Sequence, residues 1–243
     1  MAARRPDPSG PSPASLTRIL SALRNAASPE NADGMARYGI CSSHVLGISM
    51  AALRATAKDI GHDHTLALDL WKTGIFEARV LALLIDDPAR VTERQMERWA
   101  RDFDNWAICD GVCLHLFRRT PLAWTKAVQW AGRDEEFVKR AGFTLMAVLA
   151  VHDKKAVDRM FLNLLPILRR EARDGRNGVK KAVNWALRQI GKRNRRLHAA
   201  AVGEAERIRA LGGPAARWIA SDALREFRGE VVRRKLERME RKK

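Results

Sequence analysis

The chain has 243 residues, 46% of them hydrophobic, which is enough to bury a substantial core and excludes a largely disordered protein. Its formal net charge is +17 at pH 7, with a pI near 10.8. A polyanionic partner, namely DNA, RNA or an anionic membrane surface, is the simplest explanation of such an imbalance. The alternative is a basic surface that only keeps the protein soluble.

The basic charge is concentrated in the last third of the chain. Residues 171–243 contain 21 Lys and Arg against 9 Asp and Glu, which is most of the net charge. We therefore expect the anion-binding surface to lie mainly there. No apolar run reaches the roughly 18 residues that a membrane-spanning helix needs, so the sequence predicts no membrane partner.

The N-terminal residues 1–13 contain four of the nine prolines, and we expect a disordered tail there. Arg4 and Arg5 are not followed by an apolar stretch, which argues against a secretory signal and favours a cytoplasmic protein.

Residues suited to metal or disulfide chemistry are few and unfavourably spaced. The three cysteines, Cys41, Cys109 and Cys113, are an odd number without CxxC spacing, so we interpret them as core residues. His62 and His64 lie in one turn but lack further ligands at a suitable distance along the chain. The sequence predicts neither a metal nor a cofactor.

From residue 14 onward, apolar residues recur at steps of three and four, which is typical of helices, and no alternating strand pattern competes with them. In chain order the predicted helices are 14–27, 30–38, 49–60, 64–72, 74–86, 92–103, 105–117, 120–131, 135–151, 153–171, 178–193, 197–210 and 214–239. Short helices with one apolar stripe bury it by pairing antiparallel and stacking pair on pair. We therefore predict an all-α, HEAT-like array, an α-solenoid with a concave basic face. It forms one domain over 14–239, followed by a basic C-terminal tail over 240–243. A compact, non-repetitive bundle is the alternative.

One tryptophan lies on an unexpected face of the predicted helix 178–193. Its apolar stripe consists of Val179, Val183, Ala186 and Ile190. At 100° per residue Trp185 lies opposite that stripe, on a face with Lys181, Arg188 and Lys192. An aromatic ring among cations suits contact with a nucleic-acid backbone or base. The alternative is that Trp185 packs under another helix.

Helix 105–117 shows the same anomaly with the opposite charge. Its predicted core stripe is Ile108, Val112 and Leu116, whereas Trp106 and Asp110, four residues apart, project together from the far side. A carboxylate beside an indole on a basic protein indicates chemistry on a cationic centre. The alternative is a structural aspartate held by an arginine.

Arg140 borders the apolar stripe of helix 135–151. An arginine in that position can bury its stem and present its guanidinium to a phosphate. The alternative is a structural salt bridge.

Taken in order, these residues resemble the DNA alkylation repair proteins, the AlkD-like HEAT-repeat DNA glycosylases. The resemblance runs from about Tyr38 to Asn194. It rests on Gly47-Ile48 through Leu53-Arg54, Leu70-Trp71 through Glu77-Ala78-Arg79, the block from Trp106 to Asp110, Lys139-Arg140, and Lys181 to Arg188. The order and spacing of these pieces carry the resemblance. Two departures are Asn105, where some members carry another aromatic, and a longer loop from Glu171 to Gly178.

The resemblance implies a DNA glycosylase that hydrolyses the N-glycosidic bond of cationic alkylated purines such as N3-alkyladenine and N7-alkylguanine. It places Trp106, Asp110, Arg140 and Trp185 in a DNA-binding cleft, with Asp110 and the two tryptophans in catalysis. Arg140, with Lys181, Arg188 and Lys192, would hold phosphates of double-stranded DNA. Such a protein acts without a base-flipping pocket, as a monomer, in the cytoplasm of a bacterial-type cell, and associates with the nucleoid when bound to DNA.

Two other classes stay open. A non-enzymatic HEAT-repeat DNA-binding protein would use the same basic face, although it gains nothing from an acid at Asp110. A protein scaffold would read its partner through apolar or acidic patches, which the charge of +17 argues against.

Overall fold

A computed structural model describes residues 13–40 and 44–241 of the chain, and this part is helical without a strand. The predicted all-α fold is therefore confirmed. Cys41, Lys242, Lys243 and all but the last residue of the predicted tail over 1–13 lie outside the described residues. None of the described helices is long and apolar enough to cross a membrane, and no group of three potential metal ligands occurs among the described residues.

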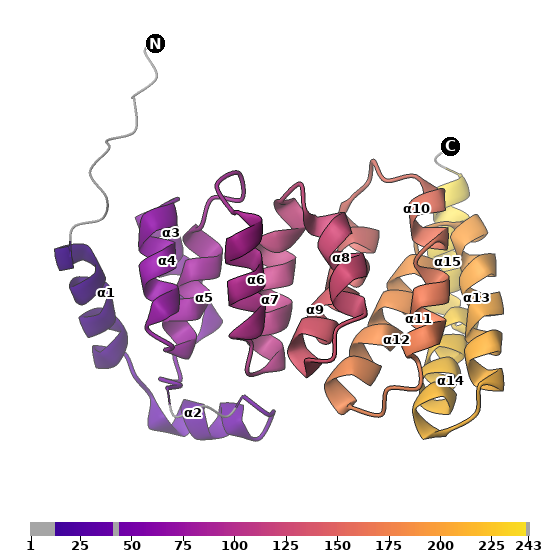
Figure 1. Ribbon diagram of the computed structural model, residues 1–243, viewed down its shortest axis with the longest axis horizontal. Helices are drawn as coiled ribbons and strands as arrows, with labels where there is room; N and C mark the ends of the chain where they lie inside the picture. Colours follow the sequence, from indigo (N-terminus) through magenta and orange to yellow (C-terminus); the bar gives the residue numbers. More distant parts are fainter. Residues whose placement is uncertain (1–12, 41–43, 242–243) are drawn as a thin grey trace, which may run out of the picture. The chain divides into compact units, whose positions relative to one another are not determined.

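By their internal contacts the helices fall into two compact units, residues 1–96 with 104–116 and residues 97–103 with 117–243. Unit 1 contains α1 (Pro13–Asn25), α2 (Pro29–Ala36), α3 (Met50–Ile60), α4 (His64–Lys72), α5 (Phe76–Ile85) and α7 (Trp106–His115), and α6 (Glu93–Arg101) contributes to both units. Within unit 1, α5 packs against α3, α4 and α7 (Figure 1). The prediction of a single domain over 14–239 stays a prediction.

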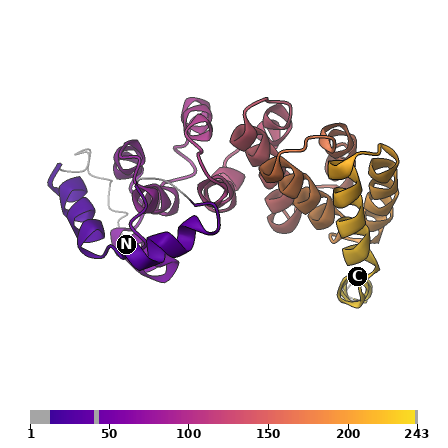
Figure 2. The same ribbon diagram turned by 90° about the horizontal axis from the view of Figure 1, so that it is seen from below.

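Unit 2 is a succession of packed helices. It contains the 3-10 helix η1 (Phe117–Arg119), α8 (Ala123–Ala131), α9 (Glu136–His152), α10 (Asp158–Leu162), α11 (Leu165–Glu171), α12 (Asn177–Gly191), α13 (Arg195–Ala210), α14 (Pro214–Arg228) and α15 (Glu230–Glu240). α9 packs against α8 and α12, and α14 packs against α12, α13 and α15 (Figures 1 and 2). The stacking that the sequence predicts is thus present within this unit.

Local chemistry explains where many helices begin. The side chains of Ser49, Asp63, Asn105 and Asn194 each accept a hydrogen bond from a backbone N–H in the first turn of the helix that follows. Such caps satisfy donors that have no partner inside the helix. The predicted and observed starts of these helices agree within two residues.

The sequence prediction is wrong about two long helices. Residues 153–171 form the two short helices α10 and α11 instead of one. The Asp153 carboxylate accepts from the N–H groups of Lys155 and Ala156 and so forms a turn before α10. Pro166 is tolerated only in the first turn of a helix, so a new helix, α11, begins there. Residues 214–239 form α14 and α15. The backbone of Gly229 is extended between them, with φ −68° and ψ 144°.

α9 is buried almost all round because α8 and α12 cover it on two sides. Gly142 marks the closest approach, since a Cβ there would lie 2.5 Å from the backbone nitrogen of Ala131. A single apolar stripe therefore does not describe this helix.

In unit 1, a buried carboxylate fastens the loop before α3. Glu77 of α5 accepts hydrogen bonds from the backbone N–H groups of Leu46, Gly47 and Ile48, at 2.9, 2.7 and 3.3 Å. Gly47 has a φ of 79°, and a Cβ there would meet the Ser28 carbonyl oxygen at 2.1 Å. The segment Glu77-Ala78-Arg79 thus includes a residue that holds the fold of unit 1.

Candidate functional site

The first candidate group lies at the start of α7, in unit 1. Asn105 is buried and caps the helix by accepting from the Ile108 N–H at 3.0 Å, so its side chain serves the helix backbone. Trp106 is the first helical residue and is 41% exposed. Asp110 lies one turn further on and is half-buried. The two therefore share a face that solvent reaches.

The predicted core of this helix is confirmed, because the stripe residues Ile108, Val112 and Leu116 are all buried, as are Cys109 and Cys113. Trp106 and Asp110 are thus not needed for the packing stripe.

The indole of Trp106 is held in place by a distant part of the chain. Its Nε1–H donates to the backbone carbonyl of Tyr38 at 2.8 Å. Nearby, Asp104 accepts from the Asn105 side chain at 2.7 Å and lies 3.7 Å from a guanidinium nitrogen of Arg79. An oriented indole loses less conformational entropy when a ligand binds to it.

The second candidate group lies on α12, in unit 2. Trp185 is half-buried, while the predicted stripe of Val179, Val183, Ala186 and Ile190 is fully buried. Lys181, one turn before Trp185, is exposed and forms no ion pair with a described residue. It is therefore a cation that is open to an anionic ligand.

Arg188 and Lys192 differ from Lys181, because both ion-pair with Glu226 of α14. Arg188 also lies 3.5 Å from Asp222. Burial alone would raise the pKa of Glu226, but hydrogen bonding to Lys192 and the charges of Lys192 and Arg188 outweigh it and lower that pKa. To contact a phosphate, Arg188 and Lys192 must break or share their ion pairs with Glu226.

The sequence reasoning missed these acids, although a signal exists. Asp222 and Glu226 are four residues apart, as are Arg188 and Lys192, so both pairs face one way on their helices. Which helices face each other depends on the stacking, and helical periodicity does not report it.

Arg140 is more buried than we expect of an arginine that binds a phosphate. It is 7% exposed, and its Nη1–H donates to the Gly178 carbonyl at 2.7 Å. The Gly178 N–H in turn donates to the Glu136 carboxylate at 3.2 Å. Arg140 and Glu136 therefore tie α9 to the first turn of α12.

The structure thus gathers the predicted residues into two groups. Trp106 and Asp110 lie together on α7. The second group lies on the packed helices α9 and α12 and at the C-cap of α12, and it consists of Arg140, Lys181, Trp185, Arg188 and Lys192.

Comparisons with known proteins concern the family and the fold of the chain. Residues 19–227 match the model of a family described as DNA alkylation repair enzyme. One solved structure superposes with a TM-score of 0.71 at 21% identity and covers 79% of this chain and 82% of its own. It is described as belonging to a new family of proteins related to the HEAT-like repeat DNA glycosylases with affinity for branched DNA structures. This likeness confirms the HEAT-like fold. No curated protein sequence matches the chain.

Proposed function

We propose that this chain, which belongs to the DNA alkylation repair enzyme family, is a DNA glycosylase that releases cationic alkylated purines from double-stranded DNA. The observation that carries the proposal is the pair on α7, a half-buried Asp110 beside an exposed and oriented Trp106. On a chain of net charge +17, an acid on that face opposes phosphate binding. It serves a reaction that develops positive charge.

The proposed chemistry is hydrolysis at C1′ of the damaged nucleotide. The C1′–N bond breaks and its electron pair leaves with the purine, which neutralises the positive charge of N3-alkyladenine or N7-alkylguanine. Water then adds to C1′ and loses a proton, which leaves an abasic site. Asp110 would stabilise the oxocarbenium-like sugar electrostatically and orient the water. Neither step needs a metal or a strong general acid.

The other residues would grip the DNA around the lesion. Trp106 would pack against the sugar of the lesion nucleotide, with a cation–π contribution of about 1 kcal/mol from the charged base. Trp185 would pack against the DNA backbone that unit 2 binds. Lys181 would bind a phosphate directly, and Arg188 and Lys192 would do so in competition with Glu226. Arg140 would hold α9 against α12 and so keep the cations of α12 in place. A contact between Arg140 and a phosphate would be a second contribution to DNA binding.

A direct test is to incubate the protein with duplex DNA that contains N7-methylguanine and to measure free base. Release above that from the same DNA without protein supports the proposal. Unmodified duplex is the control, since neutral guanine is a poor leaving group. A purified, folded protein that releases no base from N7-methylguanine or N3-methyladenine DNA contradicts it.

DNA binding should depend steeply on salt. Between about 50 and 200 mM salt, we expect affinity to fall by a factor of at least about ten, because each neutralised phosphate releases counterions. Titration of labelled duplex at several salt concentrations measures this. An affinity that does not change with salt would show that the basic side chains do not bind DNA phosphates.

Replacement of Trp185 by Ala should impair base release far more than folding. Trp185 is half-buried and lies off the packing stripe, so we expect a loss of about 1–2 kcal/mol in unfolding free energy. The matched control is Trp130→Ala, since Trp130 is fully buried and its loss should cost about 3–5 kcal/mol. Thermal unfolding and base release are measured on the same preparations. Equal destabilisation by both variants would show that Trp185 is a packing residue.

A second candidate function is DNA binding without catalysis. It is favoured by the similar solved structure, whose family is described by its affinity for branched DNA structures. Tight, salt-sensitive binding together with no base release would select this alternative.

A further inference from the structure

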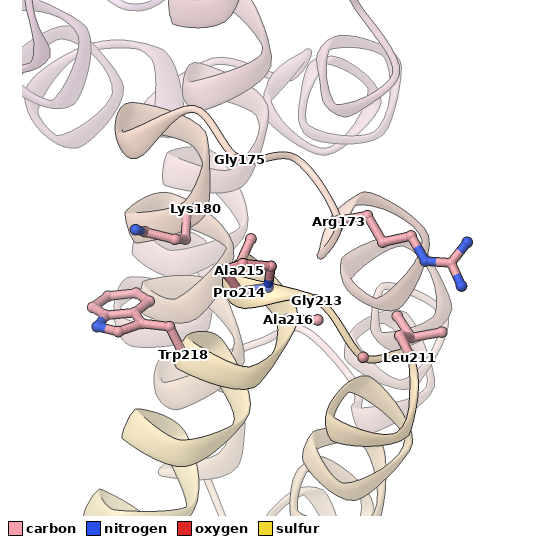
Figure 3. A pocket seen from close by; sticks show the side chains of 10 residues that line it. Arg173, Gly175, Lys180, Leu211, Gly213, Pro214, Ala215, Ala216 and Trp218 are labelled. Carbon is pink, nitrogen blue, oxygen red and sulfur yellow. The ribbon is translucent and has the colours of Figure 1, made fainter.

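A pocket of about 580 Å³ opens in unit 2 at the start of α14. Figure 3 shows its composition, with Lys180 of α12 and Trp218 of α14 together on one side and Arg173 and Leu211 on the other. Among the described residues, no acidic side chain lines it. The pocket is therefore basic and partly aromatic.

Trp218 is not needed for the core of α14. It is 40% exposed, whereas its neighbours Ala216, Ile219 and Ala220 are buried and form the packing face. The Lys180 ammonium lies 4.9 Å from the centroid of the indole ring. A large ring that remains exposed beside a cation offers a stacking surface.

The two cations at the pocket have no acidic partner among the described residues. Neither Arg173 nor Lys180 forms an ion pair with a described residue. Their neighbours do, since Arg170 pairs with Glu171 and Arg176 pairs with Asp174. Arg173 and Lys180 are therefore available to bind an anionic ligand.

A glycine turn forms the wall between these side chains. Gly212 and Gly213 have φ values of 70° and 79°, which side-chain-bearing residues rarely adopt. A Cβ at either position would meet nothing within 4 Å, so the backbone there is open. α14 also has no side-chain cap, and its positive dipole end adds to the charge of Lys180.

We infer that this pocket binds one unpaired nucleotide of DNA, with the base against Trp218 and the phosphate between Lys180 and the Gly212–Gly213 turn. Arg173 contributes long-range attraction at the rim. A paired base has both faces covered by its neighbours, whereas an unpaired base can stack on an indole. The concave shape and the volume suit a ligand of nucleotide size. This inference rests on the proposed DNA binding and adds a substrate feature to it.

The experiment compares two duplexes that contain one N7-methylguanine and differ only in a single-stranded oligothymidine extension. Wild-type protein should bind the extended duplex more tightly than the blunt one. Trp218→Ala should weaken binding to the extended duplex by about tenfold and leave the blunt duplex unaffected. Lys180→Ala should act in the same direction, and Trp218→Phe should retain most of the preference. Base release from the blunt duplex should not change in any of these variants.

Arg217→Ala is the matched charge control, because Arg217 is an exposed cation on α14 that does not line the pocket. It should not alter the preference for the extension. Thermal unfolding of each variant checks the fold. An equal loss on both duplexes, or no preference in the wild type, would overturn the inference while base release stays intact. Loss of base release with the preference retained would overturn only the glycosylase proposal.

Discussion

Replacement of Asp110 by Asn should slow base release by about 10²–10³ while leaving fold and DNA affinity nearly intact. The substitution keeps the size of the side chain and removes the negative charge that would face the developing sugar cation. Affinity should stay equal or rise, because an acid that repels phosphates has been removed. Single-turnover excision with excess protein measures the chemical step without interference from product release.

Asp104→Asn is the matched control. Asp104 precedes the same helix, is exposed and lies 3.7 Å from the Arg79 guanidinium, so it represents a structural aspartate near the site. We expect its loss to leave the excision rate unchanged. If Asp110→Asn instead lowers stability and leaves the single-turnover rate unchanged, Asp110 is a structural residue. The non-enzymatic DNA-binding function would then be preferred.

Replacement of Glu77 by Ala should lower the free energy of unfolding by about 3–5 kcal/mol. Glu77 is fully buried, and its carboxylate accepts three backbone N–H groups from residues 46–48. Alanine leaves these donors without acceptors and opens a cavity. Urea unfolding followed by circular dichroism measures the change.

Glu77→Gln separates hydrogen bonding from packing. Its amide oxygen still accepts, so it should lose less stability than Ala. A loss below about 1 kcal/mol for Glu77→Ala would mean that water replaces the carboxylate, and that the loop before α3 is not fastened by it.

The helices could be predicted from the sequence because their signals are local. Apolar spacing and the caps at Asp63, Asn105 and Asn194 act within one or two turns, and most predicted bounds lie within a few residues of the observed ones. The two predictions that are wrong also have local causes. Pro166 and Gly229 interrupt apolar patterns that otherwise continue, and periodicity alone does not weigh such an interruption.

The group on α7 could also be predicted from local spacing along the helix. Trp106 and Asp110 project from one helix, so a helical wheel places them away from the core, and the structure agrees. The Tyr38 carbonyl that orients Trp106 is 68 residues away, and no pattern within α7 indicates it.

The sequence by itself determined that the chain is helical, that its basic charge lies toward the C-terminus, and which side chains are not needed for each packing stripe. These properties depend on covalent spacing and on charge, which are present before the chain folds. Only the tertiary structure decided which cations form ion pairs and which are available to a ligand. Lys180 and Lys181 have no acidic partner among the described residues, whereas Arg188 and Lys192 meet Glu226, because an ion pair requires the register of two stacked helices. The place of Trp218 beside Lys180 arises in the same way.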